Sequence, residues 1–272
     1  MKIATMKNNA LERYYKEIEL LSEIDLEKGE KWDLASTLRS GGAAVFPHAY
    51  FSKCGHQIAA VVRGCLDCGA DQVLVLGVVH TLTEKIREAR TKERRKEESP
   101  LRGVFPSMEN EYSLFYFKFL WDLEVKRRGI KPPELIMRYP FLVNRDPATL
   151  PGIKELEAYA KDSAVVITAD LCHYGVAYGH QERKEDPHAY AEASIKRGFE
   201  VLREGSYADY YDICIETKSD SLDTCSVLKH LLGPLFATIL EIEIVDSSDL
   251  FVGDPSPSFV AASLVELKKS IA

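Results

Sequence analysis

The chain has 272 residues, 46% of them hydrophobic and 10% aromatic, which is enough to bury one large α/β core or two small ones. Its net charge of −7 gives no overall attraction to nucleic acid phosphates or anionic lipids, so a small-molecule substrate or a peptide ligand is the expected partner. The protein can be a monomer or an oligomer. No segment approaches the roughly 20 apolar residues of a membrane span or contains a signal-peptide core, so we expect a cytoplasmic protein with reduced cysteines.

The first half of the chain predicts an extension followed by a β-α-β unit. Residues 1–40 alternate charged residues with short apolar runs, which is typical of one or two peripheral helices. We therefore expect an N-terminal helical extension at 1–40 and a single α/β domain at 41–272. Within that domain, the apolar run 43–48 predicts a buried strand, and the helical pattern after it ends at Gly69. The run 72–80 is almost entirely apolar and β-branched, as a strand covered on both faces should be.

The charged stretch 84–98 mixes both signs and has few apolar residues, so it predicts a solvated helix or loop, with a lid over a site as the alternative. Alternation of helices and strands continues after it. We expect helices at about 114–123, 151–161, 186–204 and 222–240, and strands at 135–143, 164–170, 241–245 and 259–265. Pro140 should make the first of these strands irregular, because proline cannot donate a ladder hydrogen bond.

Polar side chains follow three of the predicted strands. His48 ends the first, His80 ends the second, and Asp170 ends the strand at 164–170, with His173 three residues later. In open α/β sheets the carboxyl ends of the strands meet at one edge, where ligands bind. Neutral imidazoles bind Fe, Cu or Zn, and an unligated histidine beside a carboxylate can exchange protons near neutral pH. The pattern predicts a metal site anchored by His48 and His80.

A third protein ligand is needed to hold the metal. Residue spacing alone leaves five candidates open, namely Cys225, Cys172, Glu111, Asp223 and Asp170. His56, in the first turns of the helix after the first strand, is a candidate for a supporting position beside the site.

Several motifs between about residues 41 and 265 resemble the Memo family in the same order along the chain. These motifs are Pro47-His48-Ala49-Tyr50, Val75-Leu76-Gly77-Val78-Val79-His80, Glu111-Tyr112-Ser113, Pro140-Phe141-Leu142-Val143 and Thr168-Ala169-Asp170-Leu171-Cys172-His173-Tyr174-Gly175. Memo-like proteins resemble in fold the class III extradiol ring-cleaving dioxygenases, which hold iron with two histidines and a carboxylate. The resemblance implies a three-layer α/β sandwich around one central, largely parallel sheet.

The resemblance also assigns roles to individual residues. It implies that His48, His80 and Cys225 are the metal ligands and that His173 and Asp170 form a proton-transfer pair. Fe(II) is the expected metal, and the softer thiolate ligand makes copper or zinc competitive.

The surroundings of the site depart from the family pattern. Tyr112, in Glu111-Tyr112-Ser113, stands where the family has a histidine, and we expect Glu111, Tyr112 and Tyr50 to border the pocket, with His56 nearby. The leading hypothesis is a Memo-like metal-binding protein that acts as a dioxygenase-like oxidoreductase on a small organic substrate. One alternative is a non-catalytic ligand- or peptide-binding adaptor on the same scaffold, and a second is a zinc-dependent hydrolase.

Overall fold

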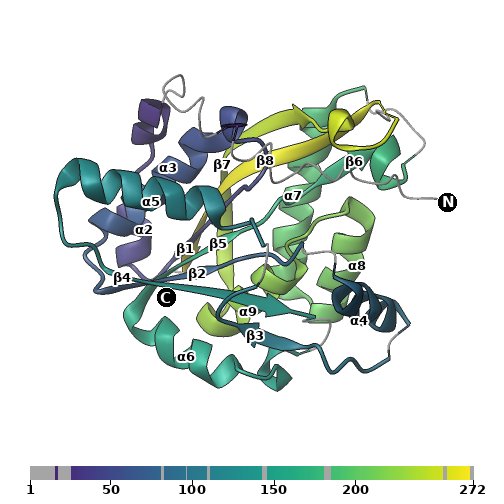
Figure 1. The fold of residues 1–272 in the computed structure, drawn as a ribbon, viewed down its shortest axis with the longest axis horizontal. Coiled ribbons are helices and arrows are strands. Elements are labelled where there is room, and N and C mark those ends of the chain that lie inside the picture. Colours follow the sequence, from purple (N-terminus) through teal and green to yellow (C-terminus); the bar gives the residue numbers. More distant parts are fainter. Residues whose placement is uncertain are drawn as a thin grey trace.

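A mixed sheet of eight strands runs through the middle of the protein, and helices cover both of its faces (Figure 1). The computed structural model describes residues 16–17, 26–80, 83–95, 97–108, 111–142, 146–180, 185–253 and 256–269. Within these ranges the chain is an α/β protein with eight α-helices. No helix in the described part of the chain combines the length and the apolar character that a membrane crossing requires.

Four parallel strands form the centre of the sheet. They lie in the order β4 (Glu134–Phe141), β2 (Gln72–Leu76), β5 (Ser163–Thr168) and β1 (Ala43–Phe46). β5 pairs in parallel with β1 on one side and with β2 on the other. Both faces of β2, β5 and β1 are covered, so nearly every residue along these three strands is buried and apolar, whereas β4 is partly exposed over its first half. The predicted strands at 43–48, 72–80, 135–143 and 164–170 are confirmed as elements.

The other four strands are antiparallel to their neighbours. β3 (Gly103–Phe105) pairs with β4, and β8 (Ser258–Lys269) pairs with β1. β6 (His173–Gly175) and β7 (Leu235–Asp246) both pair with β8. The expectation of a largely parallel sheet is therefore correct for the centre and wrong for the flanks.

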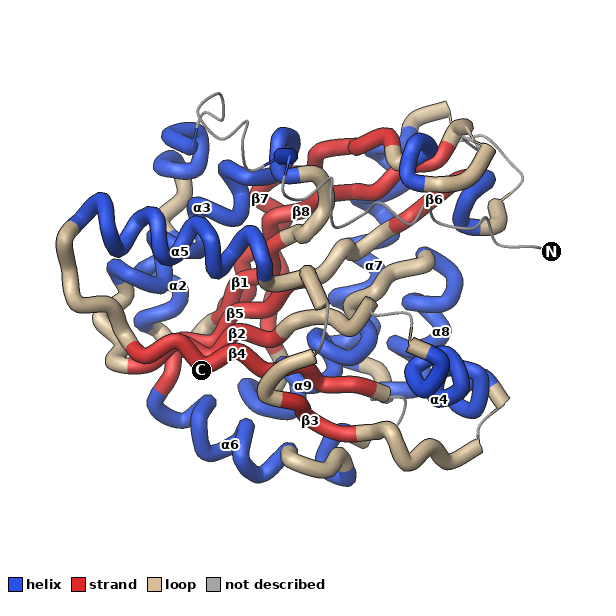
Figure 2. The backbone as a smooth tube through the Cα atoms, viewed as in Figure 1, coloured by secondary structure: helices blue, strands red, loops and turns tan. Residues whose placement is uncertain are grey.

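Helices on the two faces bury alternate residues of the central strands. One core joins α2 (Leu34–Arg39), α3 (Phe51–Asp67), α4 (Glu84–Arg94) and α5 (Phe115–Arg128) to residues such as Phe46 and Val75. The other joins α6 (Ile153–Asp162), α7 (Pro187–Glu204), α8 (Tyr207–Thr217) and α9 (Leu222–Leu232) to residues such as Val45 and Leu74. Figure 2 shows α3 and α5 on one side of the strands and α6 and α9 on the other, an arrangement consistent with three layers.

Several element boundaries differ from the expectations. The helix predicted at 222–240 ends at Leu232, because Gly233 adopts φ 78° and Pro234 cannot continue a helix. β7 then begins at Leu235, earlier than expected. α8 was not predicted, although a capping box of Ser206 and Asp209 marks its start.

The N-terminal extension is described in part. A 3₁₀ helix covers Leu26–Lys31, and α2 follows it and packs against α3. Residues 1–15 and 18–25, on which part of the helical prediction falls, lie outside the described residues. Three further short 3₁₀ helices cover Pro147–Thr149, Val176–Tyr178 and Ser248–Leu250.

Candidate metal centre

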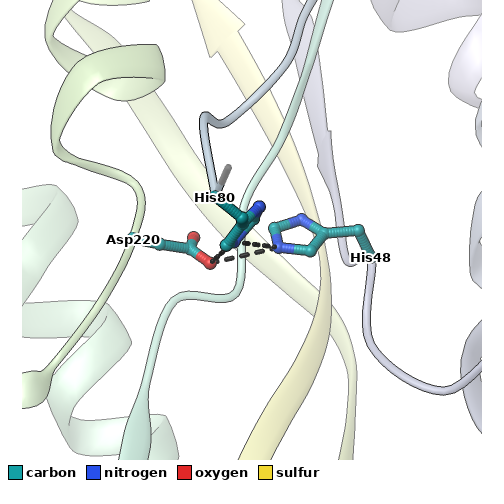
Figure 3. A group of neighbouring side chains, drawn as sticks. All are labelled: His48, His80 and Asp220. Atoms are coloured by element: carbon teal, nitrogen blue, oxygen red, sulfur yellow. Dashed lines mark hydrogen bonds and ion pairs between the residues drawn. The ribbon is translucent and has the colours of Figure 1, made fainter. Parts of the chain in front are cut away.

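Two histidines and one aspartate converge at the carboxyl ends of the parallel strands (Figure 3). His48 lies two residues after β1, His80 lies four residues after β2, and Asp220 lies in the loop between α8 and α9. The two Nε2 atoms are 3.2 Å apart, and Asp220 Oδ2 is 3.1 Å from His48 Nε2 and 3.3 Å from His80 Nε2. Three potential ligand atoms therefore lie close together in a group that could hold a metal ion.

A chain of hydrogen bonds fixes the tautomer of His48. The Thr168 hydroxyl donates to the carbonyl oxygen of Phe46 at 3.0 Å, so it accepts from His48 Nδ1, which lies 2.9 Å away. His48 Nδ1 therefore carries the hydrogen, and Nε2 keeps its lone pair. This is the tautomer that a metal ligand requires.

Glu111 fixes His80 in the same way. His80 Nδ1 lies 3.2 Å from Glu111 Oε1, and a carboxylate can only accept, so Nδ1 is the donor and Nε2 is free to bind a metal. The backbone N–H of His80 donates to the other Glu111 oxygen. Tyr112 stacks on the His80 ring at a centroid distance of 4.9 Å. A carboxylate behind a histidine is the usual support of a metal-binding imidazole.

The electrostatics of the group favour a bound cation. Burial by itself raises the pKa of Asp220, but His48 and His80 outweigh it and hold the pKa of this carboxyl well below its usual value. Burial by itself lowers the pKa of both histidines, yet the carboxylates around His48 and the Tyr112 and Glu111 side chains around His80 raise them. The pKa of Glu111 falls to about 2, against the effect of its burial, chiefly because of His80.

Asp170 and His173 lie beside this group, as the sequence predicted. The ligand atoms of Asp170, His173 and Asp220 all lie within 4.8 Å of one another. Asp170 accepts from the backbone N–H of His48 at 3.3 Å, and its own N–H donates to Asp220 at 2.8 Å. The ring of His173 is oriented by the Lys218 carbonyl, which accepts from Nδ1 at 2.7 Å. His173 Nε2 is therefore left as a proton acceptor.

The structure does not bring Cys225 into this group. Cys225 lies one turn inside α9, where it is fully buried in the core and contacts Tyr210 and Ser221. Burial raises the pKa of its thiol to about 12, which disfavours a thiolate. The expected third ligand is therefore corrected: Asp220, five residues earlier, supplies the atom that faces the two imidazoles.

The remaining predicted pocket residues divide into two sets. Tyr50 and Tyr112 line the cavity at the metal site, whereas Glu111 lies behind His80 with a fully buried side chain. His56 does not border this cavity. It contacts Glu241 of β7 and stacks on Trp32, so it belongs to a separate polar cluster.

A cavity of about 220 Å³ opens beside the metal site. The polar residues of the site line it, namely His48, His80, Asp170, His173 and Asp220. Aromatic and aliphatic side chains form most of the remaining wall among the described residues, namely Tyr50, Tyr112, Tyr116, Tyr178, Leu250, Phe251 and Val260. A mostly apolar cavity with a few converging polar groups is typical of a small-molecule site.

Comparison with known proteins gave no match, either to a family model or to a curated protein.

Proposed function

We propose that this protein is a mononuclear metal-dependent oxidoreductase of the dioxygenase type, related to the Memo family and acting on a small organic substrate. The observation that supports the proposal is the set of two imidazole Nε2 atoms and one carboxylate oxygen of His48, His80 and Asp220, which lie 3.1–3.3 Å apart beside a cavity. Two histidines and one carboxylate with open positions are typical of non-haem Fe(II) oxygenases.

The donor set fits a metal ion. Thr168 and Glu111 hold the hydrogens on the two Nδ1 atoms, so the Nε2 atoms are the positions at which both rings face Asp220. The raised pKa values of His48 and His80 favour protons on these Nε2 atoms, and a metal ion bound there takes the place of those protons. The replacement of the expected thiolate by a carboxylate makes the set harder, which favours Fe(II) over copper. We therefore propose one Fe(II) per chain.

Individual residues have separate roles at the proposed site. When bound, Fe(II) supplies electron transfer between an organic substrate and dioxygen. His173, held by the Lys218 carbonyl, accepts or returns a proton at Nε2, and Asp170 lies beside it. The Tyr178 ring lies 4.8 Å from that of His173 and, with the other aromatic side chains, shields the reacting groups from water.

Oxygen uptake by iron-loaded protein tests the proposal. A panel of catechols and other small aromatic compounds is screened with an oxygen electrode, and His173→Ala is expected to lower the rate by about 10²-fold or more while metal content stays unchanged. His188→Ala, at an exposed histidine of α7, is the matched control and should retain the wild-type rate.

Two other results would replace this proposal. Zinc fits the same three ligands, so co-purified zinc with ester or amide hydrolysis and no oxygen uptake would favour the hydrolase. Metal-dependent ligand binding without any turnover would favour a binding protein. Tyr112, stacked on His80 at the cavity wall, is the feature that favours the binding-protein alternative.

A further inference from the structure

Besides Asp170 and Asp220, the cavity is lined by a third carboxylate, which comes from the N-terminal extension. Glu17 lines the same cavity as His48 and Asp220, and its side chain is buried, with the residue only 8% exposed. Its oxygens are not among the described ligand atoms that gather within 4.8 Å of one another at the metal site. The cavity therefore has two separate negative points, one at the metal site and one at Glu17.

The Glu17 carboxylate is held in a fixed position. Its Oε2 accepts from the backbone N–H of Phe51 at 2.6 Å and from the Tyr116 hydroxyl at 3.0 Å. Phe51 is the first residue of the 17-residue helix α3, and a helix N-terminus stabilises a negative charge. The Phe51 and Tyr116 rings stack on each other at 4.5 Å, which fixes the phenol as well. A charge held this rigidly can select between ligands.

The surroundings of Glu17 suit a cationic group. Tyr50, Tyr116 and Phe251 line the cavity with it, and aromatic ring faces attract cations. A buried carboxylate beside aromatic rings is the chemistry that recognises an ammonium group.

We propose that Glu17 determines substrate specificity by binding an ammonium group that the substrate carries away from its reacting end. The inference rests on the proposed function, in which one end of the substrate reacts at the metal. It adds that the opposite end of the substrate carries an ammonium group, which binds Glu17. It predicts that amine-bearing aromatic compounds enter the cavity and that compounds with a carboxylate at the same position are rejected.

Binding of two oppositely charged probes tests this inference without reference to the metal. Phenethylamine and phenylacetate have similar size, and calorimetric titration of metal-free protein gives the dissociation constant of each. Wild-type protein should bind phenethylamine at least about tenfold more tightly, and Glu17→Gln should abolish the preference, since it keeps the shape of the side chain and removes its charge.

Two further variants separate the charge from a structural effect. Glu17→Asp keeps the charge and should restore part of the preference, and Glu27→Gln, at an exposed glutamate of the same extension, should leave it unchanged. Equal binding of both probes by wild-type protein, or an undiminished preference in Glu17→Gln, overturns the inference.

The metal-dependent part of the site is measured separately. Dopamine and 3,4-dihydroxyphenylacetate carry the same two charges on a metal-binding catechol, and their binding is compared between metal-loaded wild type and a His48→Ala/His80→Ala variant. If metal does not tighten the binding of dopamine to wild-type protein, the proposed function is contradicted and the role of Glu17 is not. If metal tightens binding but wild-type protein does not prefer dopamine over 3,4-dihydroxyphenylacetate, the role of Glu17 is contradicted and the proposed function is not.

Discussion

The two histidines of the proposed metal site are each held by a side chain that is not itself a proposed ligand. Thr168 accepts from His48 Nδ1 at 2.9 Å, and Glu111 accepts from His80 Nδ1 at 3.2 Å. Each partner leaves the lone pair of Nε2 directed at Asp220. Since such supporting hydrogen bonds typically change metal affinity by 10–100-fold, they offer a test of the site that leaves its ligands intact.

Thr168→Val is expected to weaken metal binding about tenfold or more, because valine has the same shape but cannot accept from His48. Competition with a coloured chelator measures the dissociation constant. Thr224→Val is the matched control, because Thr224 is equally buried and donates to the Thr168 carbonyl without contacting a ligand. Equal affinities in wild type and both variants would show that the tautomer of His48 is not set by Thr168.

At the residue scale, the sequence could predict the two histidines but not the carboxylate. His48 and His80 each follow a strongly apolar strand, and this pattern alone places them at one edge of the sheet. Asp220 lies between two helices in the polar stretch Lys218-Ser219-Asp220-Ser221, where aspartate is ordinary. Asp220 is joined to Asp170 by two hydrogen bonds, from the Asp170 N–H to the Asp220 carboxylate and from the Asp220 N–H to the Asp170 carbonyl. These form only in the folded chain, so no sequence signal could have found Asp220.

At the element scale, the charged stretch 84–98 proves to contain a packed helix. α4 buries Ile86 and Ala89 against the core, and Arg90 donates to the Val79 carbonyl next to His80. No described residue of α4 lines the cavity, so the structure does not support a lid. Periodicity in a segment so rich in charge was too weak to distinguish this helix from a loop.

Glu93 of α4 should make the stability of the protein depend on pH. Burial raises its pKa from 4.5 to about 7, and the Asp223 carboxylate adds to the effect. Between these two pH values the folded state retains a proton that the unfolded state has lost, so the free energy of unfolding falls as pH rises. Glu93→Gln should therefore be about 2 kcal/mol more stable than wild type at pH 8, a difference that includes a reduction for the partial exposure of Glu93. Near pH 4 the two proteins should be equally stable.

Guanidinium unfolding of wild type and Glu93→Gln at both pH values measures this difference. Glu84→Gln, at the exposed start of the same helix, is the matched control and should show no such pH-dependent gain. A stability difference that does not change between pH 4 and pH 8 would contradict the assigned role of Glu93.

At the scale of the whole molecule, the site joins segments that are far apart in the sequence. The three proposed ligands follow β1, follow β2 and precede α9, so an ion held by them would connect the centre of the sheet to the helices on one face. The alternation of apolar runs was enough to predict this α/β organisation and the position of the central strands. The antiparallel strands β3 and β6 escaped prediction because three residues carry no periodic signal.

Metal binding should therefore stabilise the entire fold. At a free metal concentration of about 1,000 times the dissociation constant, linkage gives roughly 4 kcal/mol of added stability. Thermal unfolding with and without Zn²⁺ or anaerobic Fe²⁺ measures the shift. The His48→Ala/His80→Ala variant should show none, and an equal shift in that variant would place the metal elsewhere.

Elemental analysis of anaerobically purified protein shows whether His48, His80 and Asp220 together hold one metal ion. We expect close to one equivalent of metal in wild type and in Cys225→Ser, and little or none in Asp220→Ala. Loss of the metal from Cys225→Ser, or its full retention in Asp220→Ala, would contradict this choice of ligands.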